Sequence, residues 1–432
     1  MLKKKKYKKS LILIILLSAI LGGLVAIFSG FNNKEETMIR TLADLNNTLT
    51  NEISDTASLA HLDKRINSFM QYWHFKGLSL SIMRNDSLLY AKGYGWADEQ
   101  REIKMQPSHI LRLASISKLI TATGIMVLQE EGLLSVKDTV FGPNGILNDS
   151  TYLSSIKDNN YYKITVEDLL RHKAGFTSRG GDPMFSTRHI IIQNRLDKVP
   201  DHLTLMNCVL KKPLAYVPGT SQAYSNFGYL LLSMIIEKVS GMGYEDFIRE
   251  NVLKKAGCNG FQIAKNYYRD KYDNEVRYYT QPDDIEVQEY DNSGRTVKRC
   301  YGGNDINSLS GAGAWVASTP EVALFVASID GRPEIPDIIS KESVDAMVEY
   351  FDKETYSFGW NDTNPETGWT RSGTFSGTSA LIKYFPDGEC WILVTNTSTW
   401  KGPGMSRTTA ALFNELRAAY SESLPARDLF HE

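Results

Sequence analysis

Strand patterns lie near both ends of this 432-residue chain, and the part between them favours helices. Two largely apolar segments, Leu78–Met83 and Leu88–Tyr94, flank a turn at Asn85-Asp86, which is typical of a β-hairpin. A second pair, Ala380–Phe385 and Glu389–Thr395, flanks a Pro-Asp-Gly turn. The sequence therefore predicts an α+β fold, in which an antiparallel sheet is built from both chain ends, flanked by helices, with a mostly helical middle region.

Five helices are predicted from apolar periodicity and from residues that start or stop helices. Thr165 and Asp168 resemble a capping box before one of them. The polar, Tyr-rich stretch 261–308 is interpreted as irregular surface structure. The predicted helices cover Leu62–Trp73, Ser115 to about Leu134, Val166–His172, Phe227–Val239 and Thr408–Tyr420.

The first 33 residues predict export. They carry six lysines and no acidic residue, and the lysines precede an apolar run over Leu11–Phe28. No charge occurs from Ser10 to Asn33, a length about sufficient for one transmembrane helix. By the positive-inside rule, the lysines stay in the cytoplasm and the chain after residue 34 lies outside, in the periplasm or the extracellular space. A cleaved signal peptide, which would release the protein, and a buried core helix are the alternatives.

Three parts of the chain are expected: a cytoplasmic lysine cluster with a transmembrane or signal segment over 1–33, a polar stalk over 34–60 and one folded domain over 61–432. The formal net charge is −2, and removing the six positive charges of residues 1–33 leaves −8 for the rest. An acidic body argues against a nucleic-acid partner. The expected partners are a small molecule or peptide and, through the first helix, the membrane, whereas the oligomeric state is left open.

All four cysteines lie in the part expected to be exported, where disulfides are permitted. Four cysteines allow three pairings, and buried free thiols fit the pattern equally well. No C-x-x-C, H-E-x-x-H or clustered His/Cys pattern occurs, so neither a metal nor another cofactor is expected. The cysteines are Cys208, Cys258, Cys300 and Cys390.

A candidate catalytic pair opens the apolar helix that is predicted to begin at Ser115. Ser115 and Lys118 share one helical face, whereas Ser117 is rotated away. A serine hydroxyl needs a base to take its proton, and a desolvated lysine with a lowered pKa can be that base. The helix amino terminus adds partial positive charge where an oxyanion would form. A second S-x-x-K match, Ser154–Lys157, lies in a polar loop and is interpreted as chance.

Two further segments can complete a site around this serine. Tyr224–Asn226 follows a Pro-Gly turn and precedes an apolar helix, so its side chains can project into a cleft. A phenol can relay a proton to or from a lysine, and an amide can orient the lysine and a substrate carbonyl. Arg371–Gly373 lies before the terminal hairpin, where glycine allows a close backbone approach. The next N–H, that of Thr374, could pair with the N–H of Ser115 as an oxyanion hole.

These three elements, in this order, resemble the serine β-lactamase and penicillin-binding protein superfamily. The resemblance is strongest to the class C β-lactamase-like branch, which includes D-alanyl-D-alanine carboxypeptidases, D-aminopeptidases and esterases. It spans about residues 65–420. The supporting segments are Leu111–Lys118, Leu169–Gly175, Val217–Gly219, Gly311–Gly313 and Val394–Asn396.

The resemblance implies a role for each candidate residue. Ser115 would be the acylated nucleophile, Lys118 its base partner and Tyr224 a second general acid or base, while Asn226 would position the substrate. A substrate-binding strand would consist of Arg371, Ser372, Gly373 and Thr374.

Arg371 departs from the family pattern, which usually has Lys or His at this position. Arginine keeps the positive charge but does not deprotonate in a protein, so a proton-transfer role is lost. We expect its guanidinium to bind a substrate carboxylate through two parallel hydrogen bonds. Two other residues, His172 and Trp360, are interpreted as structural. A catalytic histidine would need a serine partner, but no serine lies in a G-x-S-x-G elbow, and the tryptophan suits core packing.

The sequence thus predicts an exported serine hydrolase that forms an acyl-enzyme on Ser115 and acts on D-amino-acid peptides, β-lactams or related amides and esters. Its order of preference among these substrates is left open. The alternative is a non-catalytic or slowly deacylating sensor that binds β-lactams or muropeptides on the same fold.

Overall fold

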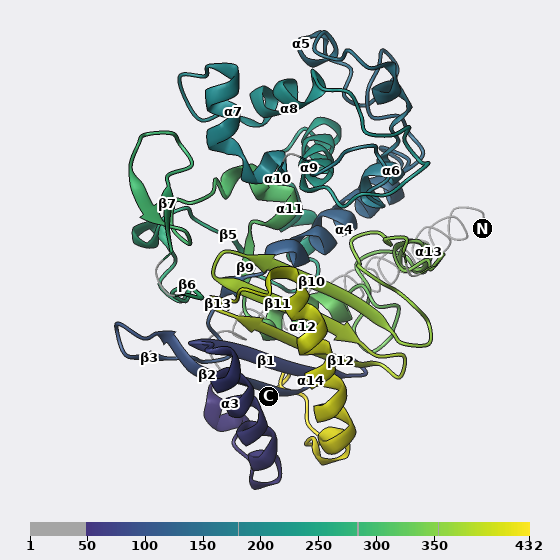
Figure 1. Ribbon diagram of the computed structural model, residues 1–432. Coiled ribbons are helices and arrows are strands. Elements are labelled where there is room, and N and C mark those ends of the chain that lie inside the picture. Colours follow the sequence, from purple (N-terminus) through teal and green to yellow (C-terminus); the bar gives the residue numbers. More distant parts are fainter. Residues whose placement is uncertain (1–48, 180, 283–284, 353) are drawn as a thin grey trace, which may run out of the picture.

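The computed structural model describes residues 49–432, except 180, 283–284 and 353. A six-stranded sheet lies at its centre (Figure 1). Strands from the two chain ends lie side by side, because the first strand pairs antiparallel with the last long one, which confirms the predicted composite sheet. In order across the sheet, its strands are β10 (Trp369–Phe375), β11 (Thr378–Tyr384), β12 (Glu389–Thr395), β1 (Gly77–Arg84), β2 (Ser87–Asp98) and β3 (Ile103–Lys104).

Both predicted hairpins are present. Asn85 and Asp86, between β1 and β2, have φ values of 47° and 59°, the left-handed pair that a two-residue hairpin turn requires. Gly388, before β12, has a φ of 87°, a conformation that glycine adopts without steric cost.

Helices fill the middle region, as predicted, but the helix expected from Ser115 is divided. A 3₁₀ turn, η3 (Ala114–Ile116), contains the serine, and the α-helix starts after it. The helices are α3 (Ala60–Trp73), α4 (Ser117–Glu130), α5 (Ser150–Leu153), α6 (Val166–Leu170), α7 (Thr187–Asn194), α8 (His202–Leu210), α9 (Asn226–Ser240), α10 (Tyr244–Ile248), α11 (Ser310–Gly313), α12 (Thr319–Ala327), α13 (Lys341–Met347) and α14 (Met405–Tyr420).

The stretch 261–308 is largely irregular, as predicted, with strands of only two or three residues. Small sheets join β4 (Leu111–Arg112), β9 (Trp315–Ala317) and β5 (Gln262–Ile263); β6 (Tyr279–Thr280) and β13 (Thr397–Ser398); and β7 (Glu286–Gln288) and β8 (Thr296–Lys298).

Alternation along β1 fixes the two faces of the sheet. Leu78, Leu80 and Ile82 belong to the apolar cluster under α3 and α14, which cover one face (Figure 1). Ser79 points to the opposite face, where its Oγ lies 2.8 Å from Oγ1 of Thr319 at the start of α12. The helical part of the domain covers this second face, and the junction between η3 and β10 becomes the site described below.

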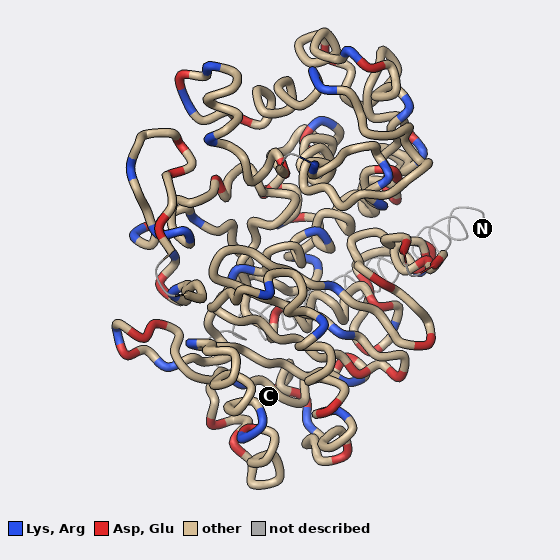
Figure 2. The backbone as a smooth tube through the Cα atoms, in the orientation of Figure 1, with Lys and Arg blue, Asp and Glu red and all other residues tan. Residues whose placement is uncertain are grey.

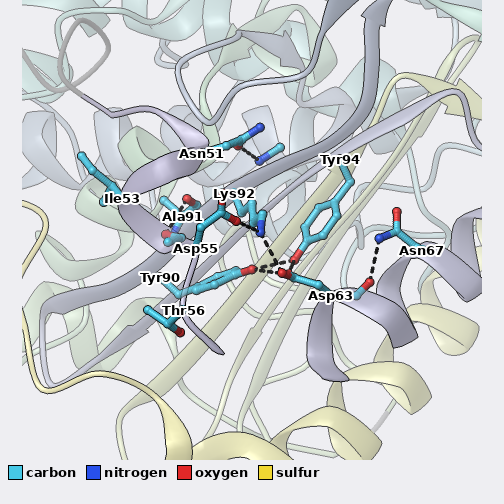
Figure 3. Close-up of polar contacts among 12 residues, drawn as sticks. Asn51, Ile53, Asp55, Thr56, Asp63, Asn67, Tyr90, Ala91, Lys92 and Tyr94 are labelled. Carbon is cyan, nitrogen blue, oxygen red and sulfur yellow. Dashed lines mark hydrogen bonds and ion pairs between the residues drawn. The ribbon is translucent and has the colours of Figure 1, made fainter. Parts of the chain in front are cut away.

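A polar cluster around the buried residues Tyr90, Lys92 and Tyr94 attaches the first described residues to the sheet (Figure 3). Lys92 of β2 forms ion pairs with Asp55 and, at 2.7 Å, with Asp63 of α3. The hydroxyls of Tyr90 and Tyr94 lie 2.8 and 2.6 Å from the same Asp63 Oδ1. The cluster therefore fastens both α3 and the segment before it to β2.

The folded domain begins earlier than predicted. Leu49 is buried, and the side chain of Asn51 donates to Met105 O at 2.8 Å and accepts from Gly93 N at 2.8 Å. Residues 49–60 thus belong to the domain rather than to a free stalk, because Asn51, Ser54 and Asp55 are paired with residues of β2 and of the segment after β3. The rest of the expected stalk, 34–48, lies outside the described residues.

The predicted transmembrane or signal segment also lies outside the described residues. Among the helices from residue 49 onward, none combines the length and apolar character needed to cross a bilayer. The four cysteines are separate buried thiols, so the structure shows the thiol alternative and no disulfide among them. Lys and Arg are interspersed with Asp and Glu over both the sheet and the helical part (Figure 2).

Candidate active site

Ser115 lies in η3, between α4 and the edge strand β10. A Cβ atom on Gly373 of β10 would lie 2.3 Å from Leu113 O and 3.1 Å from Ser115 N. Only glycine therefore allows the strand to pass so close to the serine turn. The close approach expected from Gly373 occurs, but its neighbour is the serine turn itself.

The structure brings Ser115, Lys118, Tyr224 and Asn226 together. Ser115 Oγ lies 2.8 Å from the Tyr224 hydroxyl and 3.3 Å from Lys118 Nζ. Lys118 is fully buried, and its Nζ also donates to Asn226 Oδ1 at 2.7 Å and to Ala312 O at 2.6 Å. The lysine is thus held by three oxygen atoms, none of which belongs to a carboxylate.

The electrostatic environment favours loss of a proton from the Lys118–Tyr224 pair. Burial, reinforced by the positive charge of Arg371, lowers the pKa of Lys118 to about 8. Burial alone would raise the pKa of Tyr224, but the charges of Lys118 and Arg371 outweigh it and lower that pKa to about 8. Both groups can therefore take part in proton transfer near neutral pH.

Arg371 does not occupy the position expected of a carboxylate clamp. Its side chain is fully buried; Nε donates to Ser115 O at 2.7 Å, and Nη2 donates to the Tyr224 hydroxyl at 3.2 Å. Alternation along β10 explains the difference, since residue 371 points inward with Gly373 while residues 370, 372 and 374 face outward. The guanidinium thus supports the serine turn and the tyrosine instead of reaching into the substrate space.

The outward side of β10 faces a cleft of about 670 Å³, a size that accommodates a small ligand. Ser372 N donates to Asn361 Oδ1 at 2.6 Å on the outer edge of the strand, where Thr370 forms a β-bridge with Asp362. Because alternate N–H groups of a strand point the same way, the N–H of Thr374 also faces this edge. Residues that line the cleft include Ser115, Phe185, Tyr224, Asn226, Glu354, Tyr356, Asn361, Thr370, Ser372, Thr374 and Arg407.

His172 and Trp360 are both buried, as expected of structural residues. The His172 ring lies against the Tyr224 ring, with centroids 4.4 Å apart, and its Nδ1 accepts from Ser225 N at 3.2 Å. Burial, together with Lys118 and Arg371, holds the pKa of His172 well below its usual range. The neutral imidazole therefore packs against the tyrosine and does not reach the serine.

Four residues of the site were missed in the sequence. Asp182 accepts from Asn226 Nδ2 at 2.8 Å, and Ala312 O accepts from Lys118. Asn361 and Arg407 line the cleft. Only Ala312 had a signal, the Gly-Ala-Gly segment that supported the resemblance. The other three come from loops or helix starts whose sequences carry no pattern.

Comparisons with known proteins agree with the fold. The chain matches the Beta-lactamase family over residues 62–416. Penicillin-binding protein 4* of Bacillus subtilis is 26% identical over 354 residues, which cover 78% of this chain and 71% of that protein. The octameric penicillin-binding protein homologue from Pyrococcus abyssi is 25% identical, with a TM-score of 0.60 over 84% of this chain and 77% of that chain. The D-amino acid amidase from Ochrobactrum anthropi SV3 shares the fold at 19% identity, with a TM-score of 0.58 over 83% and 92%.

The family match begins in α3 and ends in α14, so it includes the serine turn, the tyrosine segment and β10. The resemblance seen in the three sequence motifs is thereby confirmed. This chain belongs to the beta-lactamase family and is a serine hydrolase.

Proposed function

We propose that the protein hydrolyses D-amino-acid peptides, β-lactams or related amides and esters through an acyl-enzyme on Ser115. The observation that carries the proposal is the 2.8 Å contact between Ser115 Oγ and a tyrosine hydroxyl whose pKa two cations lower to about 8. A phenolate, or the neutral amine of Lys118 beside it, can accept the serine proton as Oγ attacks.

In acylation, Ser115 Oγ bonds to the substrate carbonyl carbon and its proton passes to the Lys118–Tyr224 pair. The N–H groups of Ser115 and Thr374 would stabilise the oxyanion. The leaving amine or alcohol departs with the proton from Tyr224, which leaves the acyl-enzyme. Water then attacks the ester, gives a proton to the same pair, and Ser115 recovers its proton as the acid is released.

The position of Arg407 favours a substrate that carries a negative charge. It is an exposed cation in the first turn of α14 and lines the same cleft as Ser115. The first turn of a helix favours negative charge, so a carboxylate near Arg407 would meet two favourable fields. This residue, rather than the buried Arg371, is our proposed contact for the carboxylate of a D-Ala-terminated peptide or a penicillin.

Labelling tests the proposal. The purified protein is incubated with a fluorescent penicillin and, separately, with a fluorophosphonate, and the labelled peptide is identified by mass spectrometry. Both labels are expected on Ser115 and should be absent from Ser115→Ala. Ser154→Ala is the matched control, because that serine heads the other S-x-x-K match in an exposed turn. Fluorophosphonate labelling that persists in Ser115→Ala would disprove the nucleophile assignment, and a penicillin label that never turns over would favour the sensor alternative.

We also propose that the domain is exported and held at the cell envelope by the transmembrane segment that the sequence predicts within residues 1–33. The six lysines followed by an uncharged run over residues 10–33 support this. A reporter that is active only outside the cytoplasm, fused after Glu432, should be active. Activity of a cytoplasm-only reporter at the same position would refute export.

A further inference from the structure

We infer that Asp182 is a positioning residue of this active site, which fixes the Asn226 amide so that the lone pair of neutral Lys118 faces the hydroxyls of Ser115 and Tyr224. The inference rests on the proposed acyl-enzyme function and adds a residue that lies outside its three motifs. Asp182 lies in the loop before α7, far in sequence from the serine, the tyrosine and β10.

The contacts form a chain of alternating donors and acceptors. Asp182 Oδ2 accepts from Asn226 Nδ2 at 2.8 Å, and Asn226 Oδ1 accepts from Lys118 Nζ at 2.7 Å. The other oxygen, Asp182 Oδ1, accepts from Met184 N at 2.9 Å and caps the short turn Pro183–Phe185. The carboxylate is therefore fixed at both oxygens, one on its own loop and one on the catalytic amide.

An asparagine amide is nearly symmetrical in shape, so its partners decide which end faces which way. A carboxylate can only accept hydrogen bonds, and it therefore selects the NH₂ end of Asn226. The oxygen end is left facing Lys118. A protonated Lys118 also selects this oxygen, because an ammonium can only donate, but once the lysine is neutral Asp182 alone among these contacts holds the amide in this orientation.

The orientation matters most when Lys118 has lost its proton. A neutral amine has two hydrogens and one lone pair. Ala312 O and Asn226 Oδ1 can only accept, so they take the two hydrogens. Only the hydroxyls on the remaining side, those of Ser115 and Tyr224, can donate, so the lone pair points to that side. A reversed amide would instead offer an NH₂ donor to that lone pair and draw it away from the serine.

The negative charge of Asp182 has a second, measurable effect. The charged or titratable groups that act on Lys118 are Tyr224, Arg371, Asp182 and the neighbouring His172. Asp182 is the only carboxylate among them, and it raises the pKa of Lys118 against burial and Arg371. Removing its charge should move the titration of the pair to lower pH.

Three substitutions of Asp182 separate positioning from helix capping. Asn is as good a cap as Asp, but it turns an NH₂ group towards Asn226 and favours the reversed amide. Ala removes the cap and leaves the amide free, whereas Glu keeps an acceptor and the charge. Activity is measured as kcat/KM on the neutral ester p-nitrophenyl butyrate over pH 5–10, so that no substrate charge contributes.

If Asp182 positions the amide, kcat/KM should be highest for Asp182→Glu, lower for Asp182→Ala and lowest for Asp182→Asn. Asp182→Asn should lower the plateau of kcat/KM by roughly 100-fold, the cost of a misdirected catalytic group. Its acid limb should move to lower pH, an effect that damage to a loop would not produce. Asp201→Asn is the matched control and should change neither, since Asp201 caps α8 through Thr204 N at 2.8 Å and touches no residue of the site.

If Asp182 only caps the turn, Asp182→Asn should be more active than Asp182→Ala. The inference is overturned by that order, or by Asp182→Asn activity within twofold of wild type with an unmoved acid limb. If Asp182→Asn fails to fold, as judged by its unfolding temperature, the Glu and Ala variants decide: equal plateaus and equal limbs would overturn the inference. Failure of the proposed function is distinct, because wild type and Ser115→Ala would then hydrolyse the ester equally.

Discussion

Two buried clusters of this domain combine a lysine with tyrosine, and their neighbours carry opposite charges. In the first, Lys92 lies between Asp55 and Asp63, with the Tyr90 and Tyr94 hydroxyls on Asp63 (Figure 3). Burial would lower the pKa of Lys92, but the two carboxylates raise it above its ordinary value. Burial and Asp63 raise the pKa of both tyrosines, and Asp55 adds to the shift of Tyr90.

The second cluster reverses each of these shifts. Lys118 has no carboxylate in contact, and a second cation, Arg371, lies beside Tyr224. The pKa values of the lysine and the tyrosine both fall to about 8. Burial lowers the pKa of both lysines and is complete at Lys118; at Lys92 two carboxylates outweigh it, whereas at Lys118 no carboxylate is in contact and a second cation adds to it.

The largest expected effect is the loss of Lys118 itself. Lys118→Met keeps the length and removes the base, so acylation by a fluorophosphonate should slow by roughly 1000-fold. Stopped-flow or gel-based labelling rates measure this. Lys92→Met is the matched control and should label at the wild-type rate, since Lys92 lies in the cluster under α3 and not in the cleft. Equal slowing of both variants would show that folding, not proton transfer, is responsible.

A smaller effect is expected when the second cation is removed from the Lys118 cluster. For wild type, kcat/KM should rise with pH to a plateau, with an apparent pKa near 8, because a proton must leave the pair before the serine can give up its own. Arg371→Met removes a charge that lowers the pKa of Tyr224, so the acid limb should move to higher pH. Activity at pH 7 should fall roughly 10- to 30-fold, about 2 kcal/mol for one charge-assisted contact.

The substrate dependence of this loss distinguishes the two interpretations of Arg371. If Arg371 is a buried support of the site, Arg371→Met should lower activity on p-nitrophenyl butyrate and on a penicillin by the same factor. A loss confined to the penicillin would restore the carboxylate clamp that the sequence suggested, and it would contradict the burial of this side chain.

The smallest effect on activity is expected for Lys92, in the cluster that is paired with carboxylates. Lys92→Met leaves Asp63 with two phenol donors but without its cation, and the domain should lose about 2 kcal/mol, between the values for exposed and fully buried pairs. The midpoint of urea unfolding should fall, while kcat/KM stays within twofold of wild type. An unchanged midpoint would mean that Lys92 does not fasten α3 and the preceding segment to β2.

Much of the fold follows from local patterns. The hairpins at both chain ends, the helix after Tyr224 and the capping box at Thr165 depend on residues close in sequence, and all are found in the structure. The helix at Ser115 was predicted too simply. Ala114 has a φ of 48°, which places the serine in a 3₁₀ turn ahead of α4, and packing against β10 rather than local propensity holds it there.

The sequence alone was enough to predict which residues form the candidate site, because S-x-x-K, Y-x-N and the Gly of β10 are short motifs whose order is characteristic of the family. Tertiary structure alone decided their electrostatics and their partners. Strand alternation turned Arg371 inward, and a loop 44 residues before Asn226 supplied Asp182. Chain folding also placed carboxylates beside Lys92 and a cation beside Tyr224. A pKa depends on burial and on charges within a few ångströms, and residues distant in sequence provide both only after the chain has folded.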